Sequence, residues 1–91
     1  MVSPLRARVI AVLEQAGYRN SETSLPLHPA GTFSALGGDS GVNVTWRCWD
    51  ATEDELAAMR AGIVAALRAG GLEVHEAGTR LYVPPPGEPA R

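Results

Sequence analysis

The side chains of this 91-residue chain that could do chemistry are a serine between glycines, one cysteine, two histidines and a group of acids. Ser40 stands in the sequence Gly-Asp-Ser-Gly at residues 38–41, with His28 upstream. A serine beside a histidine could act as a nucleophile. Cys48 together with His28 and His75 could bind a metal ion, because thiolates and imidazoles are ligands for zinc. Paired carboxylates could serve as a general acid and a general base.

The sequence Gly-Asp-Ser-Gly resembles the segment around the nucleophile of chymotrypsin-like serine proteases. This resemblance implies a nucleophilic Ser40 with His28 as its base. It covers four residues only, because Val42 stands where the family has its next glycine, no separate upstream Asp accompanies His28, and the chain is too short for the family's two barrels. Gly, Asp and Ser are also the residues that turns prefer. We therefore expect residues 38–41 to form part of a turn.

The other chemical candidates are predicted to be structural. Neither histidine nor the cysteine belongs to a C-x-x-C or H-x-x-x-H spacing that would present two ligands together. Cys48 alternates with Trp46 on the expected core side of a strand, and no His or Lys adjoins it to activate the thiol. The four acids between residues 50 and 55 are explained by the start of a helix. The sequence thus predicts no catalytic residue, no metal site and no cofactor.

A first helix is predicted at about 4–16. Ser3 can cap a free amide, Pro4 fits the first helical position without loss of a hydrogen bond, and apolar residues then recur at helical spacing. Gly17 is the expected stop.

A second helix is predicted at about 53–69, and it is the clearest element of the chain. Thr52 and Glu55 have the spacing of a capping box, and three acids stand at the positive end of the helix dipole. Gly62 inside this helix costs about 1 kcal/mol relative to Ala. Gly62 therefore either permits close packing or brings no benefit.

The best strand is 42–49, where side chains alternate strictly. One face has Val42, Val44, Trp46 and Cys48, and the other has Asn43, Thr45, Arg47 and Trp49. With residues 32–36 it is expected to form a hairpin whose loop is the five residues 37–41. Residues 18–32 contain two prolines and no sustained period, which indicates a long connection or an edge segment, with a short irregular strand at 24–28 as an alternative.

A second hairpin is predicted from residues 72–76 and 79–83. A two-residue loop at Ala77-Gly78 would pair Val74 with Leu81 and His75 with Arg80, and it would put all four aliphatic residues on one face. A loop of three or four residues is the alternative, because Ala is awkward where positive φ is needed.

These elements predict an α+β domain in the order α-β-β-α-β-β. The economical architecture is a two-layer sandwich, in which two helices cover one face of a four-stranded antiparallel sheet. A single domain is expected over residues 1–83, followed by a Pro-rich, mobile tail at 84–91.

Composition supports a folded chain and excludes some classes of protein. The hydrophobic fraction of 45% and charged fraction of 20% are those of a globular protein. A net charge of −2 gives no global attraction to nucleic acid. The single cysteine, the lack of an apolar leader and the lack of a long apolar run predict a cytoplasmic protein without a membrane span. All eight basic residues are Arg, which with abundant Ala, Gly and Pro is typical of a GC-rich bacterial genome.

Candidate binding residues lie on the polar side of the two best strands. Arg47 and Trp49 share one side of strand 42–49, and Arg80 and Tyr82 share the corresponding side of the last strand. Aromatic residues and Arg are enriched at binding hot spots. If no other element covers this face, these four residues form a partner-binding surface; the alternative is that Trp49 simply packs under a loop.

The leading functional prediction is a small non-enzymatic protein-binding or assembly module. It would self-associate as a homodimer, or bind a protein partner, through an open sheet face or a sheet edge. The alternative is a small DNA-binding regulator from a GC-rich bacterium or its mobile elements, because helix 53–69 with residues 72–83 resembles the last helix and wing of winged-helix proteins. That family has a further helix before its recognition helix, whereas none is evident here between 18 and 51, and three acids would face the phosphates.

Overall fold

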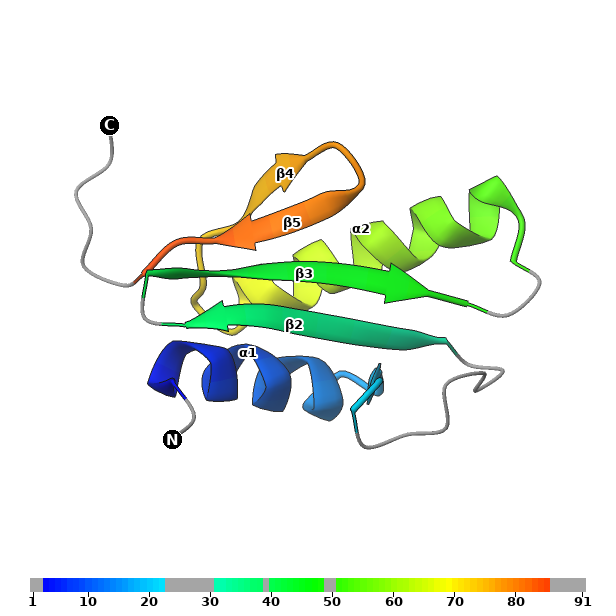
Figure 1. Cartoon of the computed structure of the whole chain (residues 1–91). Coiled ribbons are helices and arrows are strands. Elements are labelled where there is room, and N and C mark those ends of the chain that lie inside the picture. Colours follow the sequence, from blue (N-terminus) through cyan, green and yellow to red (C-terminus); the bar gives the residue numbers. More distant parts are fainter. Residues whose placement is uncertain (1–2, 23–30, 39, 49–50, 86–91) are drawn as a thin grey trace.

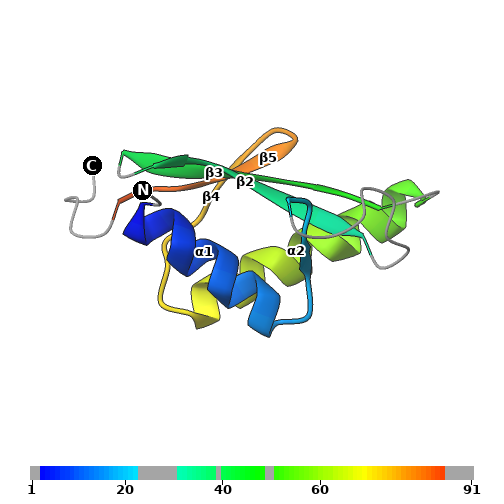
Figure 2. The same cartoon turned by 60° about the horizontal axis from the view of Figure 1, so that its bottom comes forward.

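The computed structural model describes residues 3–22, 31–38, 40–48 and 51–85. They form an α+β fold in which two helices pack on a five-stranded mixed sheet (Figure 1). In chain order the elements are α1 (Pro4–Gln15), β1 (Arg19–Asn20), β2 (Thr32–Gly38), β3 (Gly41–Arg47), α2 (Glu53–Ala69), β4 (His75–Ala77) and β5 (Arg80–Val83). Both helices lie on the same side of the sheet, as Figure 2 shows.

Both helices begin and end as the sequence predicts. Ser3 accepts a hydrogen bond from the amide of Arg6, and the reciprocal capping box between Thr52 and Glu55 is present. Gly17 and Gly71 follow the helices with φ of 98° and 83°. This left-handed conformation favours glycine, and it lets the amide after each glycine bond back to the last helical turn.

The sheet order is β1-β2-β3-β5-β4, which differs from the predicted four antiparallel strands. The additional strand, β1, pairs in parallel with the start of β2 within the segment expected to be a connection. A strand of two residues is too short to leave a periodic signal. The alternative strand at 24–28 and the end of the tail lie outside the described residues.

The β2–β3 hairpin is tighter than predicted. Gly38 pairs with Gly41, so the strands extend through the expected five-residue loop and leave a two-residue turn. Gly37 and Gly41 have φ of 132° and 133°, a conformation that L side chains rarely adopt. The glycines that suggested a long loop are therefore part of the ladder itself.

The register of the last hairpin is shifted by two residues from the prediction. His75 pairs with Tyr82 and Ala77 with Arg80, so the turn is Gly78-Thr79. Gly78, rather than Ala77, occupies the first turn position with φ of 62°. Because a shift of two residues preserves the alternation of faces, the predicted inward set of Leu72, Val74, Leu81 and Val83 is confirmed as buried.

The core lies between the sheet and the helices. Fully buried side chains come from every layer: Val9, Leu13, Phe33, Val42, Val44, Ile63, Leu67, Leu81 and Val83. Trp46 packs against this cluster while remaining partly exposed. The opposite face of the sheet carries no helix among the described residues, and it is the surface considered next (Figure 2).

Candidate functional site: the outer face of the sheet

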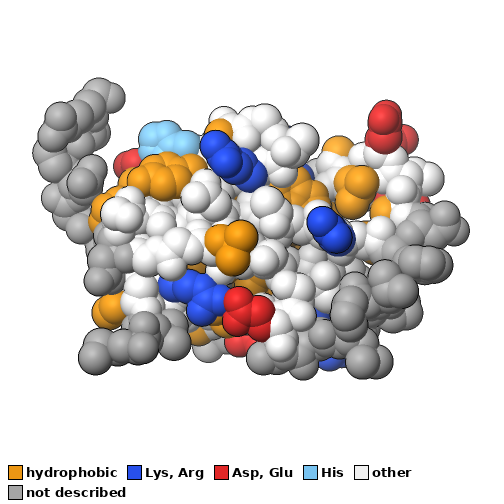
Figure 3. Space-filling model, viewed as in Figure 1, with side chains coloured by type: hydrophobic (Ala, Val, Ile, Leu, Met, Phe, Trp, Pro, Cys, Tyr) orange, Lys and Arg blue, Asp and Glu red, His pale blue; other side chains and the backbone are white. Residues whose placement is uncertain are grey.

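The outer face of the sheet is defined by the register of the strands. Neighbouring outward pairs on β2 and β3 are Thr32 with Arg47, Ser34 with Thr45, and Leu36 with Asn43. We call the outward positions of the five strands the outer face: Arg19, Thr32, Ser34, Leu36, Gly38, Gly41, Asn43, Thr45, Arg47, His75, Ala77, Arg80 and Tyr82. Figure 3 shows this side, on which basic and hydrophobic side chains are spread and acidic side chains appear beside a basic group, beside the histidine and at the upper right.

Three of the four predicted binding residues are placed on the outer face. Arg47 ends β3, whereas Arg80 and Tyr82 belong to β5, and Tyr82 pairs with Asn43. Arg47 and Arg80 are exposed, and Tyr82 is half-buried. Trp49 lies outside the described residues, so its part of the prediction is untested.

Tyr82, which the sequence predicted only as a binding residue, also stabilises the β2–β3 turn. Its hydroxyl donates a hydrogen bond to the carbonyl oxygen of Ser40 at 2.9 Å. Its ring lies against Gly41 so closely that a Cβ there would be 2.4 Å from the Tyr82 hydroxyl oxygen. The ring thus covers a glycine in the neighbouring strand and braces the β2–β3 turn.

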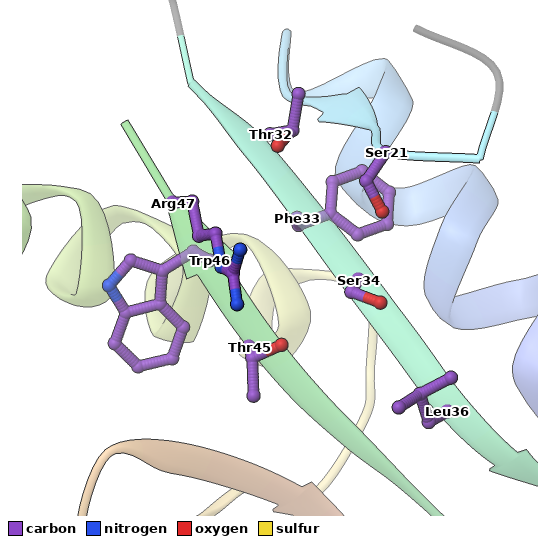
Figure 4. Close-up of a pocket in the computed structure, with 8 residues that line it drawn as sticks. All are labelled: Ser21, Thr32, Phe33, Ser34, Leu36, Thr45, Trp46 and Arg47. Carbon is purple, nitrogen blue, oxygen red and sulfur yellow. The ribbon is translucent and has the colours of Figure 1, made fainter. Parts of the chain in front are cut away.

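A cavity of about 320 Å³ opens on the outer face across β2 and β3 (Figure 4). Its lining residues are Ser21, Thr32, Phe33, Ser34, Leu36, Thr45, Trp46 and Arg47. Four of these carry hydroxyl groups, and the Arg47 side chain runs back along β3 toward Thr45. A hollow that combines hydroxyls with a guanidinium can donate several hydrogen bonds to an anionic or carbonyl oxygen.

The charged residues around the cavity on the outer face are basic. Arg19, Arg47 and Arg80 are exposed there, and none of them takes part in an ion pair or side-chain hydrogen bond within the described residues. No described outward position of the sheet is Asp or Glu. Glu73, just before β4, is 2.6 Å from the ring of His75. The part of the face around the cavity is therefore basic, and Glu73 adds an acid beside His75 at the β4 edge, on a chain whose net charge is −2.

Leu36 is the large hydrophobic side chain most open to solvent in the described chain, with 60% of its surface exposed. It projects from β2 beside Asn43 and forms one wall of the cavity. Single exposed hydrophobes are common on protein surfaces. Here, however, Leu36 lines the cavity on a sheet face that no described helix covers, so it marks a contact point on that face.

The edges of the sheet are less open than its outer face. On the free side of β2, the carbonyl oxygen of Phe33 accepts from the amide of Ser21 at 2.9 Å. The carbonyl oxygen of Ala35 accepts from Nε of Arg6 at 2.8 Å. The other edge strand, β4, has only three residues. Covered and short edges discourage pairing with a further strand.

A second hollow of about 290 Å³ lies between α2, β3 and the β4–β5 turn, lined by Trp46, Leu56, Ala57, Arg60 and Thr79. Arg60 spans it: its guanidinium carbon is 5.7 Å from the centre of the Trp46 ring. The same side chain donates to Glu76 at 3.0 Å and to the carbonyl oxygen of Gly78 at 2.6 Å. Arg60 therefore ties the last hairpin to α2, which gives this hollow a structural explanation.

The remaining chemical candidates are not brought together. Ser40 is an exposed residue of the β2–β3 turn, in agreement with the predicted turn, and His28 lies outside the described residues. His75 is opposite Tyr82 and beside Glu73, instead of opposite Arg80 as predicted. Within the described chain, no three His, Cys, Asp or Glu residues are grouped to hold a metal ion. No described helix is both long and apolar enough to cross a bilayer.

Two residues of the outer face were missed by sequence reasoning. Leu36 was assigned to a strand, but only the alternation of Ser34, Ala35 and Leu36 could have placed it on the exposed side. Arg19 gave no signal, because the strand that orients it has only two residues and forms only by pairing with β2.

Comparisons of the chain with models of protein families, with curated proteins and with solved structures found no match.

Proposed function

We propose that this protein is a non-enzymatic protein-binding or assembly module that acts through the outer face of its sheet. The observation that carries the proposal is the one-sided layering: both helices cover the inner face, while the outer face has an exposed Leu36 beside a cavity and no described covering element. A sheet face left open in this way is commonly covered by a second protein surface.

The described side chains of the two hollows are suited to binding. The cavity on the outer face has hydroxyls, Arg47 and apolar side chains as its lining, and the second hollow has Trp46, Arg60 and apolar groups. Among the described lining residues of both hollows there is no His, Cys, Asp or Glu that could act as a base for a neighbouring hydroxyl. What these surfaces offer is contact area and hydrogen-bond donors.

The composition of the outer face favours a reversible contact over a permanent one. Obligate interfaces resemble a core cut in half, whereas this face has one exposed leucine among hydroxyls and arginines. Self-association through it would place arginines of two copies near one another. We therefore expect a weak dimer whose association strengthens as added salt screens that repulsion.

Sedimentation velocity over a concentration series tests self-association through this face. The average mass should rise reversibly at high micromolar concentration. Leu36→Lys should abolish that rise, because it places a charge within the proposed contact without disturbing a buried side chain. The matched control is Ala65→Lys, which adds the same charge at an exposed position of α2. Equal effects of the two variants, or a strictly monomeric wild-type chain, would contradict self-association.

The winged-helix alternative is tested with a duplex DNA oligonucleotide in low salt. The structure lends it no specific support, since the described part of 18–51 is strand and turn and the first turn of α2 is acidic. Binding to DNA that weakens as salt increases would favour the regulator over the module.

A further inference from the structure

We propose that the preferred occupant of the outer face is an acidic segment of a protein partner, whose carboxylates bind in the cavity between β2 and β3. This inference rests on the proposed function and narrows it to a partner of defined chemistry. It assigns Arg47 and the neighbouring hydroxyls to the recognition of a carboxylate, and it assigns Arg19 and Arg80 to the flanking acids.

The hydrogen-bond donors of the cavity lie in two neighbouring cross-strand pairs of β2 and β3. Thr32 stands opposite Arg47 in one cross-strand pair, and Ser34 stands opposite Thr45 in the next outward pair. Figure 4 shows the Arg47 guanidinium reaching back over β3 toward Thr45, with Ser34 across from it on β2. Successive outward pairs on adjoining strands are spaced for contacts with one extended ligand. A carboxylate in this position can accept from a guanidinium and from hydroxyls together.

These donors are unused within the described chain. The side chains of Arg47, Ser34 and Thr45 make no hydrogen bond to another described residue. By contrast, Arg6, Arg8, Arg60 and Arg68 each donate to a carbonyl or carboxylate of the fold. The arginines of the helices are thus committed to structure, whereas those of the outer face are available to a partner.

Charge decides between a second copy and an acidic partner. The outward positions of the sheet include Arg19, Arg47 and Arg80 and no described acid. Two such faces packed together would oppose guanidinium groups, which makes self-association the weaker use of the surface. An acidic segment would instead meet complementary charge at the three outward arginines, and it would avoid the end of the face where Glu73 contacts His75.

The arrangement also favours a protein over a nucleic acid. Single-stranded nucleic acids are bound by aromatic platforms on which bases stack. Of the rings near the cavity, Tyr82 is held against Gly41 with its hydroxyl bonded to Ser40, and the Trp46 ring lies 5.7 Å from the guanidinium carbon of Arg60. His75 is beside Glu73. Because each of these rings already has a partner in the fold, the hydroxyls and arginines, which bind oxygens, are the groups left for a ligand.

Fluorescence anisotropy with a labelled oligoglutamate peptide tests the proposal on the full chain. The peptide should bind in low salt, and its affinity should fall as salt rises from about 0.02 M to about 0.2 M, where the Debye length becomes shorter than about 10 Å. Arg47→Glu should weaken binding by at least about tenfold, which corresponds to about 1.4 kcal/mol. Ser34→Ala combined with Thr45→Val should weaken it while leaving the net charge unchanged.

The matched control is Arg8→Glu, which changes the net charge equally but lies on α1, in the layer away from the outer face. Circular dichroism confirms that each variant is folded. Absence of binding in low salt overturns the proposal, and so does an equal loss of affinity in Arg8→Glu and Arg47→Glu. Tighter binding of an oligonucleotide of equal length, with the same dependence on Arg47, would also overturn it and would assign the face to nucleic acid.

The inference and the function it rests on fail in different ways. If oligoglutamate does not bind but self-association requires Leu36, the outer face remains a binding surface and only the acidic partner is refuted. If neither oligoglutamate binding nor self-association depends on the outer face, the proposed function fails as well.

Discussion

Replacing Gly62 of α2 by Ala should destabilise the protein, although a helix interior ordinarily favours Ala. The reason is Tyr18, which lies after α1 and packs against the core. A Cβ built on Gly62 would be 2.1 Å from the hydroxyl oxygen of Tyr18 and 3.4 Å from its Cζ. The first distance is far below van der Waals contact, whereas the second is an ordinary contact.

The net effect follows from two opposing contributions. Helix propensity alone would make Ala more stable than Gly by about 1 kcal/mol. Forcing an extra methyl against a packed side chain costs about 1–3 kcal/mol. We therefore expect Gly62→Ala to lower the free energy of unfolding by about 1 kcal/mol in the wild-type background. In a Tyr18→Phe background the hydroxyl is gone, and the same substitution should be stabilising by up to about 1 kcal/mol.

Urea unfolding followed by far-ultraviolet circular dichroism measures the four chains of this cycle. With an m value near 1 kcal/mol/M, each change of 1 kcal/mol shifts the midpoint by roughly 1 M. Ala65→Gly, at an exposed position of the same helix, calibrates the propensity contribution and should cost about 1 kcal/mol. The reasoning is refuted if Gly62→Ala stabilises both backgrounds equally, because the Tyr18 hydroxyl would then not occupy the space beside Gly62.

Three further substitutions, and a fourth that serves as a control, test other contacts of the fold by the same unfolding measurement. Gly41→Ala should cost about 3 kcal/mol or more, since the position has positive φ and lies under the Tyr82 ring; Gly38→Ala, with open space around it, should change stability by less than about 1 kcal/mol. Arg60→Ala should cost about 1–2 kcal/mol by releasing the β4–β5 hairpin from α2, and faster amide exchange confined to that hairpin would identify the cause. Thr52→Ala should cost about 1 kcal/mol through loss of the capping box, and an unchanged midpoint would show that this helix start is frayed.

The helices were predictable because their signals are local. Thr52 and Glu55 define the start of α2, and the two glycines after it define its end. Each of these signals involves hydrogen bonds between residues that are close in the sequence. The inward set of the last hairpin was equally predictable, since alternation assigns a face without reference to the partner strand. Such features need no knowledge of the tertiary structure.

Register and strand number were not predictable in the same way. The turn at Gly78-Thr79 and the turn at Ala77-Gly78 both place the aliphatic residues inward, so the hydrophobic pattern cannot distinguish them. Positive φ at Gly78 decides the question, and Arg60 adds to it by binding the carbonyl oxygen of that residue from α2. Likewise β1 exists only because the chain after Gly17 runs beside Thr32 and Phe33.

The outer face depends both on local sequence pattern, which is predictable, and on tertiary contacts, which are not. Alternation along β3 and β5 correctly assigned Arg47, Arg80 and Tyr82 to one side of the sheet, but it could not show how each is used. The ring of Tyr82 packs on Gly41 and its hydroxyl bonds to Ser40, so Tyr82 contributes to folding. Arg47 and Arg80 remain available for binding. The sequence predicted a binding surface of aromatic and basic residues, whereas the described surface around the cavity combines arginines with hydroxyl donors. For this reason we expect an acidic partner rather than a second copy of the chain to bind there.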